Sequence, residues 1–165
     1  MLNSISFFCA FALVISSVFS LSLMAATPTP APANKSAADP AVTGTKEFPE
    51  NVLKASSVAS QAWLTFVDQN KYAESWDKAS TLTKLTVAKD EWVQILEKTR
   101  KPLGSMTSRQ IMDQRTAIDP DGMPKGKYIV MFYKTVFSHK TAFELVTLYL
   151  EEGQWSVLTY QVNAE

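Results

Sequence analysis

Three β-rich runs near the C-terminus constrain the fold of this 165-residue chain more than any other feature. They lie within residues 127–162 and are separated only by short polar breaks at residues 138–140 and 152–153. Aromatic and β-branched residues dominate all three runs, as is typical of strands, and breaks this short favour direct hairpins. The sequence therefore predicts a three-stranded antiparallel meander.

The two breaks also predict how the strands pair. If each break forms the loop of a hairpin, Lys134 faces Glu144 on the next strand, and Glu144 faces Gln161 on the last one. Arg109, from the neighbouring strand, would join them at one end of the sheet. These four residues are the candidate pocket: either they satisfy one another at the sheet margin, or they form the polar floor of a ligand site.

The opposite face of the predicted sheet is rich in aromatic residues, which are enriched where proteins meet partners. We expect helices to cover one side of the sheet only, leaving this face to pair with a second copy of the chain or with an envelope protein. In the alternative, the sheet curves so tightly that these side chains line its own cavity. The candidate interface residues are Tyr133, Phe143, Leu145, Tyr149 and Tyr160.

The first half of the mature chain has a helical pattern. Apolar residues within residues 50–70 recur at the spacing of an amphipathic helix, and a second, short helix is expected over residues 71–79. Residues 81–86 lack such a pattern and are expected to be irregular. A third helix, capped by Thr86, is expected to close at residues 101–104.

Trp63 and Trp92 lie on the apolar stripes of these helices, so we predict that they are core residues and not ligand contacts. A fourth strand is predicted over residues 105–118, before the meander. The predicted fold class is therefore α+β, with three N-terminal helices packed on one face of a curved, four-stranded antiparallel sheet.

Residues 1–26 form an apolar stretch without acidic or basic side chains, as in a secretory signal peptide. Residues 5–26 could also span a bilayer, so a retained inner-membrane anchor is the alternative. Residues 27–49, rich in Pro, Ala and Thr, are predicted to be a disordered linker. We expect a single periplasmic or secreted domain over residues 50–165, touching a membrane only through an uncleaved N-terminus. Residues before Asn51 are expected to contribute nothing to its stability.

Composition argues against several functions. The 16 basic and 16 acidic residues balance and form no basic stripe, which argues against nucleic acid as a partner. Cys9 lies in the N-terminal stretch, so the mature domain has no thiol. His139, the one histidine, falls in a predicted hairpin loop, where it cannot assemble a hydrolytic triad or a zinc site. We expect neither a metal nor a cofactor.

A set of residues spaced across the mature domain carries a family resemblance. It comprises Trp63-Leu64, Asp68, Tyr72, Ser75-Trp76, Trp92, Arg100, Pro102-Leu103-Gly104, Ser108-Arg109, Asp121-Gly122, Tyr128, Phe137, Glu144, Gly153, Trp155 and Tyr160. This set resembles the bacterial domain of unknown function family 4019. The resemblance implies export and an organisation similar to the nuclear transport factor 2-like and cystatin-like folds, in which a helix and a curved sheet enclose a cone-shaped cavity. It implies no particular reaction or ligand.

Two hypotheses about function follow. The first is a non-enzymatic exported module that binds or scaffolds an envelope protein or a small amphipathic ligand. The alternative is a cone-fold enzyme that uses Glu144 as a general base in a pocket with Lys134 and Arg109. A general base must be able to accept a proton, whereas an ion-paired carboxylate is held in its charged form. The predicted pairing therefore favours a binding module.

Overall fold

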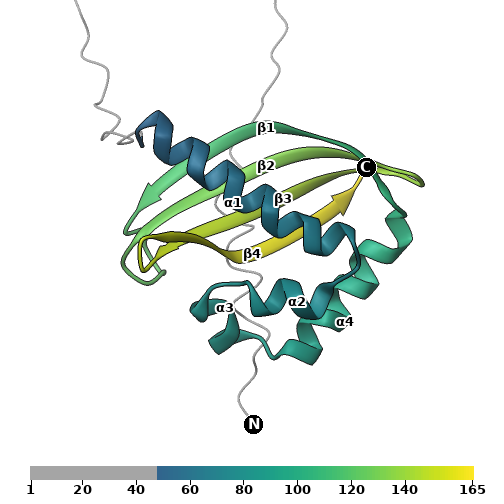
Figure 1. Cartoon of the computed structure of the whole chain (residues 1–165), viewed down its shortest axis with the longest axis horizontal. Coiled ribbons are helices and arrows are strands. Elements are labelled where there is room, and N and C mark those ends of the chain that lie inside the picture. The colour runs from purple at the N-terminus through teal and green to yellow at the C-terminus, as the bar shows by residue number, and fades with distance from the viewer. Residues whose placement is uncertain (1–47) are drawn as a thin grey trace, which may run out of the picture. The chain divides into compact units, whose positions relative to one another are not determined.

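The computed structural model describes residues 48–165; the predicted signal peptide or anchor and most of the predicted linker lie outside this part of the chain. Helices come first and strands follow (Figure 1). The elements are α1 (Glu50–Asp68), α2 (Tyr72–Asp77), α3 (Thr81–Thr86), α4 (Lys89–Arg100), the 3-10 turn η2 (Lys101–Leu103), β1 (Met106–Ile118), β2 (Lys127–Phe137), β3 (Thr141–Glu151) and β4 (Gln154–Ala164). The predicted α+β class is confirmed, with four α-helices in place of three.

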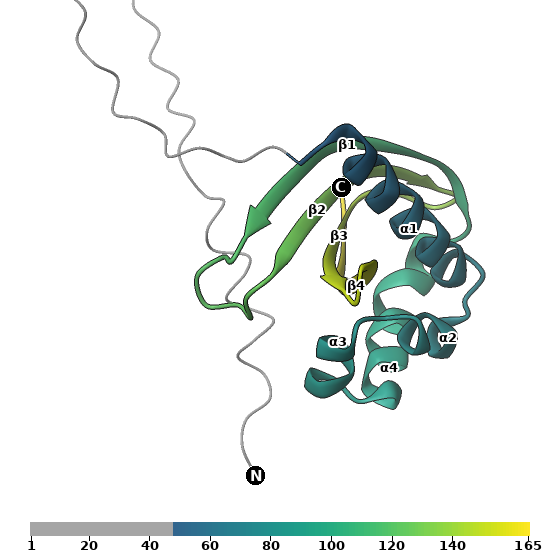
Figure 2. The ribbon, with the colours of Figure 1, turned by 60° about the vertical axis from the view of Figure 1, so that its left-hand side comes forward.

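The strands form one antiparallel sheet in the order β1-β2-β3-β4. Figure 2 shows that the sheet is curved and that the helices lie on its hollow side. We call this side the inner face and the opposite side the outer face. Within the described part of the chain, no helix is long and apolar enough to cross a membrane.

Residues 81–86 form helix α3, although the sequence predicted irregular structure there. The hydroxyl of Ser80 caps the helix by accepting from the backbone N–H of Thr83 at 3.1 Å, a preferred arrangement for a helix start. The Thr83 hydroxyl in turn lies 3.1 and 2.8 Å from the carbonyl oxygens of Val157 and Leu158 on β4. The helix is held by its cap and by the sheet, so it needs no apolar periodicity of its own.

The register of the hairpin between β2 and β3 is shifted by one residue from the predicted one. Tyr133, and not Lys134, lies opposite Glu144. The reason is a tighter turn: Phe137 donates its backbone N–H to the carbonyl of Lys140 at 2.9 Å, which leaves two residues between them in place of the predicted three. Because side chains alternate between the two faces of a strand, a shift of one residue moves each side chain of β2 to the other face relative to β3.

The hairpin between β3 and β4 forms at the predicted turn, but its register changes along the strands. An irregularity between Thr147 and Leu148 shifts the pairing by one residue. Beyond it, Glu144 lies opposite Val162 and not opposite Gln161 as predicted. An extra residue of this kind redirects the side chains that follow it.

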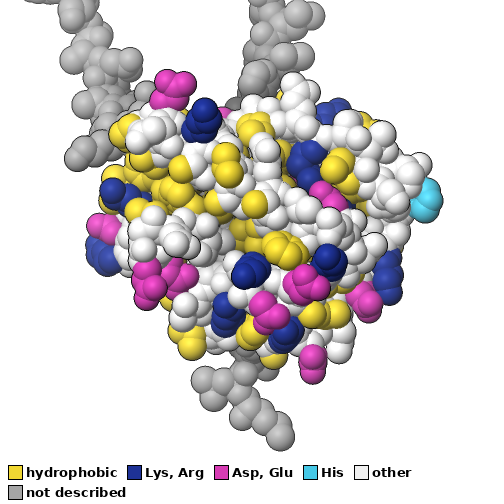
Figure 3. All heavy atoms as spheres, viewed as in Figure 1, with side chains coloured by type: hydrophobic (Ala, Val, Ile, Leu, Met, Phe, Trp, Pro, Cys, Tyr) yellow, Lys and Arg dark blue, Asp and Glu magenta, His cyan; other side chains and the backbone are white. Residues whose placement is uncertain are grey.

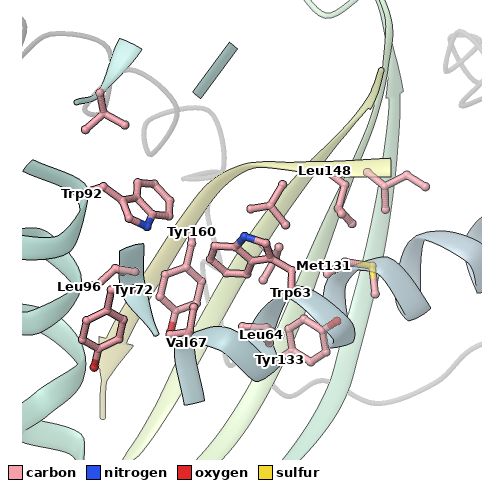
Figure 4. Packing of buried hydrophobic residues seen from close by; sticks show 14 of the residues in the cluster. Trp63, Leu64, Val67, Tyr72, Trp92, Leu96, Met131, Tyr133, Leu148 and Tyr160 are labelled. Carbon is pink, nitrogen blue, oxygen red and sulfur yellow. The ribbon is translucent and has the colours of Figure 1, made fainter. Parts of the chain in front are cut away.

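Aromatic side chains fill the space between the helices and the inner face, where they point toward one another (Figure 4). Trp63 and Trp92 are 4% and 2% exposed, with ring centroids 6.1 Å apart, and the Trp63 ring lies 5.5 Å from that of Tyr160. Both indole N–H groups donate to Ser75, to its carbonyl and its hydroxyl respectively. The prediction that both tryptophans are core residues is confirmed.

The packed core begins before the predicted boundary at residue 50. Phe48 is only 7% exposed, and its ring centroid lies 6.1 Å from that of Trp155 on β4. The next residue, Pro49, accepts from the backbone N–H of Val52 in the first turn of α1. The folded domain therefore includes Phe48, which the sequence assigned to the disordered linker.

Candidate functional site

A buried ion pair lies at the centre of the candidate site. Glu144 on β3 is completely buried, and its Oε2 accepts from Arg109 Nε of β1 at 2.7 Å. The hydroxyl of Thr135 also donates to this oxygen, and the hydroxyl of Tyr160 donates to Oε1 at 2.5 Å. Three donors, one from each of the other three strands, therefore satisfy a single carboxylate, as a buried charge requires.

Asp68, the last residue of α1, links the helices to this ion pair. Its carboxylate accepts two hydrogen bonds from Arg109, at 2.7 and 2.8 Å, and one from Arg100 Nη2 at 2.7 Å. Two-pronged pairing of this kind fixes the planar guanidinium group in one orientation. We call Asp68, Arg100, Arg109 and Glu144 the charge cluster; it contains two cations and two anions and joins α1, α4, β1 and β3.

The surroundings keep Arg109 and the neighbouring Tyr160 in fixed protonation states. Burial by itself lowers the pKa of Arg109, but its hydrogen bonds to Asp68 and the charge of Glu144 outweigh burial and raise this pKa overall. Burial also raises the pKa of Tyr160 well above 10, and the adjacent negative charge of Glu144 adds to the effect. Arg109 therefore stays charged and Tyr160 stays protonated at neutral pH.

Arg100 is the least satisfied member of the charge cluster. Its side chain is 4% exposed, and Nη1 lies 3.8 Å from Glu144 Oε1, too far for a hydrogen bond. Its Nε and Nη1 atoms are buried and have no hydrogen-bond partner among residues 48–165. The guanidinium carbon lies 4.3 Å from the ring centroid of Phe137, which supports the cation from one side.

A cavity of about 250 Å³ opens beside the charge cluster, at the ends of α1 and α4. Its walls combine charged, polar and aromatic side chains. The lining residues are Asp68, Asn70, Tyr72, Arg100, Lys101, Gly104 and Ser105. Among residues 48–165, no group of three or more His, Cys, Asp or Glu side chains is placed to hold a metal ion.

The structure brings together only two of the four residues predicted to form a pocket. Arg109 and Glu144 are in contact, whereas Lys134 lies on the outer face and pairs there with Glu165 at 3.0 Å. Gln161 lies opposite Leu145, also on the outer face. The predicted pairing of Lys134 with Glu144 is wrong because the register between β2 and β3 is shifted by one residue. The predicted pairing of Gln161 with Glu144 is wrong because of the irregularity between β3 and β4.

The predicted interface residues also divide between the two faces. Phe143, Leu145 and Tyr149 lie on the outer face, and the Phe143 side chain is 41% exposed. Tyr133 and Tyr160 lie on the inner face, where they are 1% and 5% exposed. Tyr133 donates to the Ser60 hydroxyl of α1 at 2.8 Å, so these two tyrosines belong to the core.

Sequence reasoning missed several contributors to the site. Asp68, Arg100 and Thr135 were not assigned to the pocket, and Tyr160 was assigned to the other face. Asp68 and Arg100 nevertheless belong to the spaced residue set of the family, and each is the last residue of its helix. Helix ends that meet at one edge of a sheet were therefore the signal that could have indicated this cluster.

Comparison with known proteins gives a family and a distant structural likeness. The fold is similar to the crystal structure of an NTF-2 like protein of unknown function from Silicibacter pomeroyi DSS-3, with a TM-score of 0.46 and 9% sequence identity over 70% of this chain and 97% of that chain. No curated protein matches this chain. The model of the family "Protein of unknown function (DUF4019)" matches residues 59–160. Because this match spans more than half of the sequence, the chain belongs to the DUF4019 family.

Proposed function

We propose that this protein is an exported, non-enzymatic module that associates with a second copy of itself through the outer face of its sheet. The observation that carries the proposal is the outer face, which no helix within residues 48–165 covers (Figures 1 and 2). The apolar N-terminal stretch supports export. The side chains on this face include Asp113 and Arg115 of β1, Val130, Phe132, Lys134 and Val136 of β2, Phe143, Leu145 and Tyr149 of β3, and Thr159 and Gln161 of β4.

The state of Glu144 argues against the alternative of a cone-fold enzyme. A general base needs a carboxylate that can reach a substrate proton. Glu144 is fully buried, and its oxygens already accept from Arg109, Thr135 and Tyr160. Trp63 and Trp92 are packed in the core between the helices and the inner face of the sheet. The charge cluster is therefore better suited to fixing the helices on the sheet than to acid–base chemistry.

The centre of the outer face is apolar and electrically balanced. Phe132 and Leu145 lie side by side there, and Phe143 and Val136 are 41% and 40% exposed. Its charged side chains are paired within the chain: Asp113 with Arg115 at 2.8 Å and Lys134 with Glu165 at 3.0 Å. Two copies can therefore meet without like-charge repulsion, whereas the face offers no excess of opposite charge to a strongly charged partner.

By contrast, charged side chains of both signs are interspersed over the face that carries α1 (Figure 3). The outer face is also large enough for a dimer. Its four strands have at least 11 residues each, which corresponds to roughly 700 Å² per copy at ordinary strand spacing and rise. Two such faces could bury up to about 1,400 Å² if they met over their whole area, against the roughly 1,000 Å² that specific interfaces need.

Light scattering of the protein purified after export, measured across micromolar concentrations, tests this proposal. We expect the mass to rise from that of one copy to that of two, and Leu145→Glu to abolish the rise because it buries a charge in the interface. Val58→Glu is the matched control, since Val58 is 61% exposed on α1. A single-copy mass at all concentrations would overturn self-association. If both variants lost the rise in mass equally, the outer face would not be the contact between copies.

A further inference from the structure

We propose that Asp113 prevents the exposed edge of the sheet from pairing with a strand of another copy of this chain. Strands β1 and β4 are the two edges of the sheet. An edge strand has a row of unpaired backbone N–H and C=O groups, onto which another chain can add a strand. The proposal concerns this edge and not the outer face, so it does not depend on the self-association proposed above.

The edge formed by β4 is covered by another part of the chain. Ala79 forms a parallel β-bridge with Val157, and the backbone N–H of Ser80 donates to the Val157 carbonyl at 2.8 Å. The Thr83 hydroxyl lies within hydrogen-bond distance of the carbonyl oxygens of Val157 and Leu158. Helix α3 and the residues before it therefore occupy acceptors on this edge.

The edge formed by β1 has no such cover within residues 48–165, where only β2 pairs with it and no helix backbone is bonded to it. Its register with β2 is continuous over residues 113–118. Just beyond, Asp119 donates its backbone N–H to the Gly126 carbonyl at 2.8 Å. In an antiparallel pair such bonded positions alternate with positions whose backbone groups point away from the partner strand. Counting back from Asp119, the positions that point away from β2 are Gln114, Thr116 and Ile118.

A side chain already occupies the first of these outward donors. Oδ1 of Asp113 accepts from the backbone N–H of Gln114 at 2.8 Å, and Oδ2 accepts from Arg115 Nε at 2.8 Å. The arginine holds the carboxylate in this orientation. An incoming strand would have to displace the carboxylate to reach the Gln114 donor, and charged side chains on an edge strand oppose such pairing.

The irregular register beside Asp113 supports the same role. The pairing of β1 with β2 shifts between Ile111 and Asp113, where Met112 is the extra residue and is 56% exposed. An extra residue of this kind bends an edge strand and interrupts the surface that it offers for pairing. The regular part of the edge therefore presents its first outward donor at Gln114, which is the donor that Asp113 occupies.

The test compares two substitutions of Asp113 in the protein purified after export. Asp113→Ala removes the acceptor, whereas Asp113→Asn removes the same charge but keeps an oxygen that can accept from Gln114. Light scattering measures the mass, and hydrogen exchange followed by NMR measures the protection of the backbone amides. For Asp113→Ala we expect a larger mass than for wild type at the same concentration. The amides of Gln114, Thr116 and Ile118 should then exchange more slowly as the concentration rises, whereas in wild type and Asp113→Asn their exchange should stay constant.

Amide exchange distinguishes the edge from the outer face, because contact between two outer faces adds no backbone pairing to β1. An unchanged mass for Asp113→Ala, or a larger mass without slower exchange in β1, would overturn the proposal. Equal assembly of Asp113→Ala and Asp113→Asn would assign the effect to the lost charge and contradict a role for the hydrogen bond. Asp121→Ala, which removes a carboxylate from the turn between β1 and β2, is the charge control and should behave as wild type.

Discussion

Arg109 and Glu144 form a buried ion pair between the edge strand β1 and the inner strand β3, with Arg109 Nε 2.7 Å from Glu144 Oε2. The same guanidinium group holds Asp68 at the end of α1. One arginine therefore connects the sheet to the longest helix. This connection explains why four ionisable side chains lie in the interior of a small domain, where charges are otherwise costly.

Replacing Glu144 by Gln should destabilise the domain strongly while keeping the shape of the side chain. The change leaves Arg109 and Arg100 with only one carboxylate between them, and breaking a buried pair in this way costs about 3–5 kcal/mol. Urea denaturation would measure the free energy of unfolding. Glu165→Gln is the control, because its pair with Lys134 is exposed and should be worth less than about 1 kcal/mol. Equal effects of the two substitutions would contradict a structural role for the cluster.

Tyr160 should make the domain less stable at alkaline pH. Burial raises its pKa in the folded state well above 10, whereas in the unfolded chain it titrates near 10. The folded state therefore keeps a proton that the unfolded state loses, so stability is fully present below about pH 10 and falls as the pH rises further.

Comparing wild type with Tyr160→Phe isolates this effect, because the other buried tyrosines are common to both proteins. The variant should be about 1.5–3 kcal/mol less stable at neutral pH, where it lacks the hydrogen bond to Glu144. Its stability should then decline less steeply than that of wild type above about pH 10. Parallel denaturation curves across this range would show that Tyr160 ionises equally in both states.

Phe48→Ala should destabilise the domain, contrary to the expectation that residues before Asn51 contribute nothing. The ring is almost fully buried against Trp155, and removing a buried Phe typically costs about 3–5 kcal/mol, with the lower end expected near a chain terminus. Leu85→Ala is the control, since Leu85 is 77% exposed. Thermal unfolding would detect the difference. An unchanged melting temperature for Phe48→Ala would restore the boundary at residue 50.

The strands and long helices could be predicted from the sequence because their apolar spacing is strong and local. Helix α1, for example, ends within two residues of its predicted limit. The charge cluster could be predicted only in part, because it depends on strand register. Both registers of the β2–β3 hairpin place plausible neighbours opposite Glu144, and the sequence around residues 137–140 does not reveal that Lys140 pairs with Phe137.

The remaining members of the cluster come together through contacts distant in sequence. Asp68 and Arg109 are 41 residues apart, and Asp68 and Arg100 are 32 apart. No local pattern encodes such pairs. The irregularity in β3–β4, which turns Gln161 outward, likewise carries no glycine to mark it.

Hydroxyl-radical footprinting with mass spectrometry tests association through the outer face most directly, because it reports which side chains lose contact with water as copies associate. We predict that oxidation of Phe143 and Leu145 falls as protein concentration rises through the micromolar range, while oxidation of Val58 and Leu85 on the helical side stays constant. Unchanged oxidation of all four residues at a concentration where the mass corresponds to two copies would contradict association through the outer face.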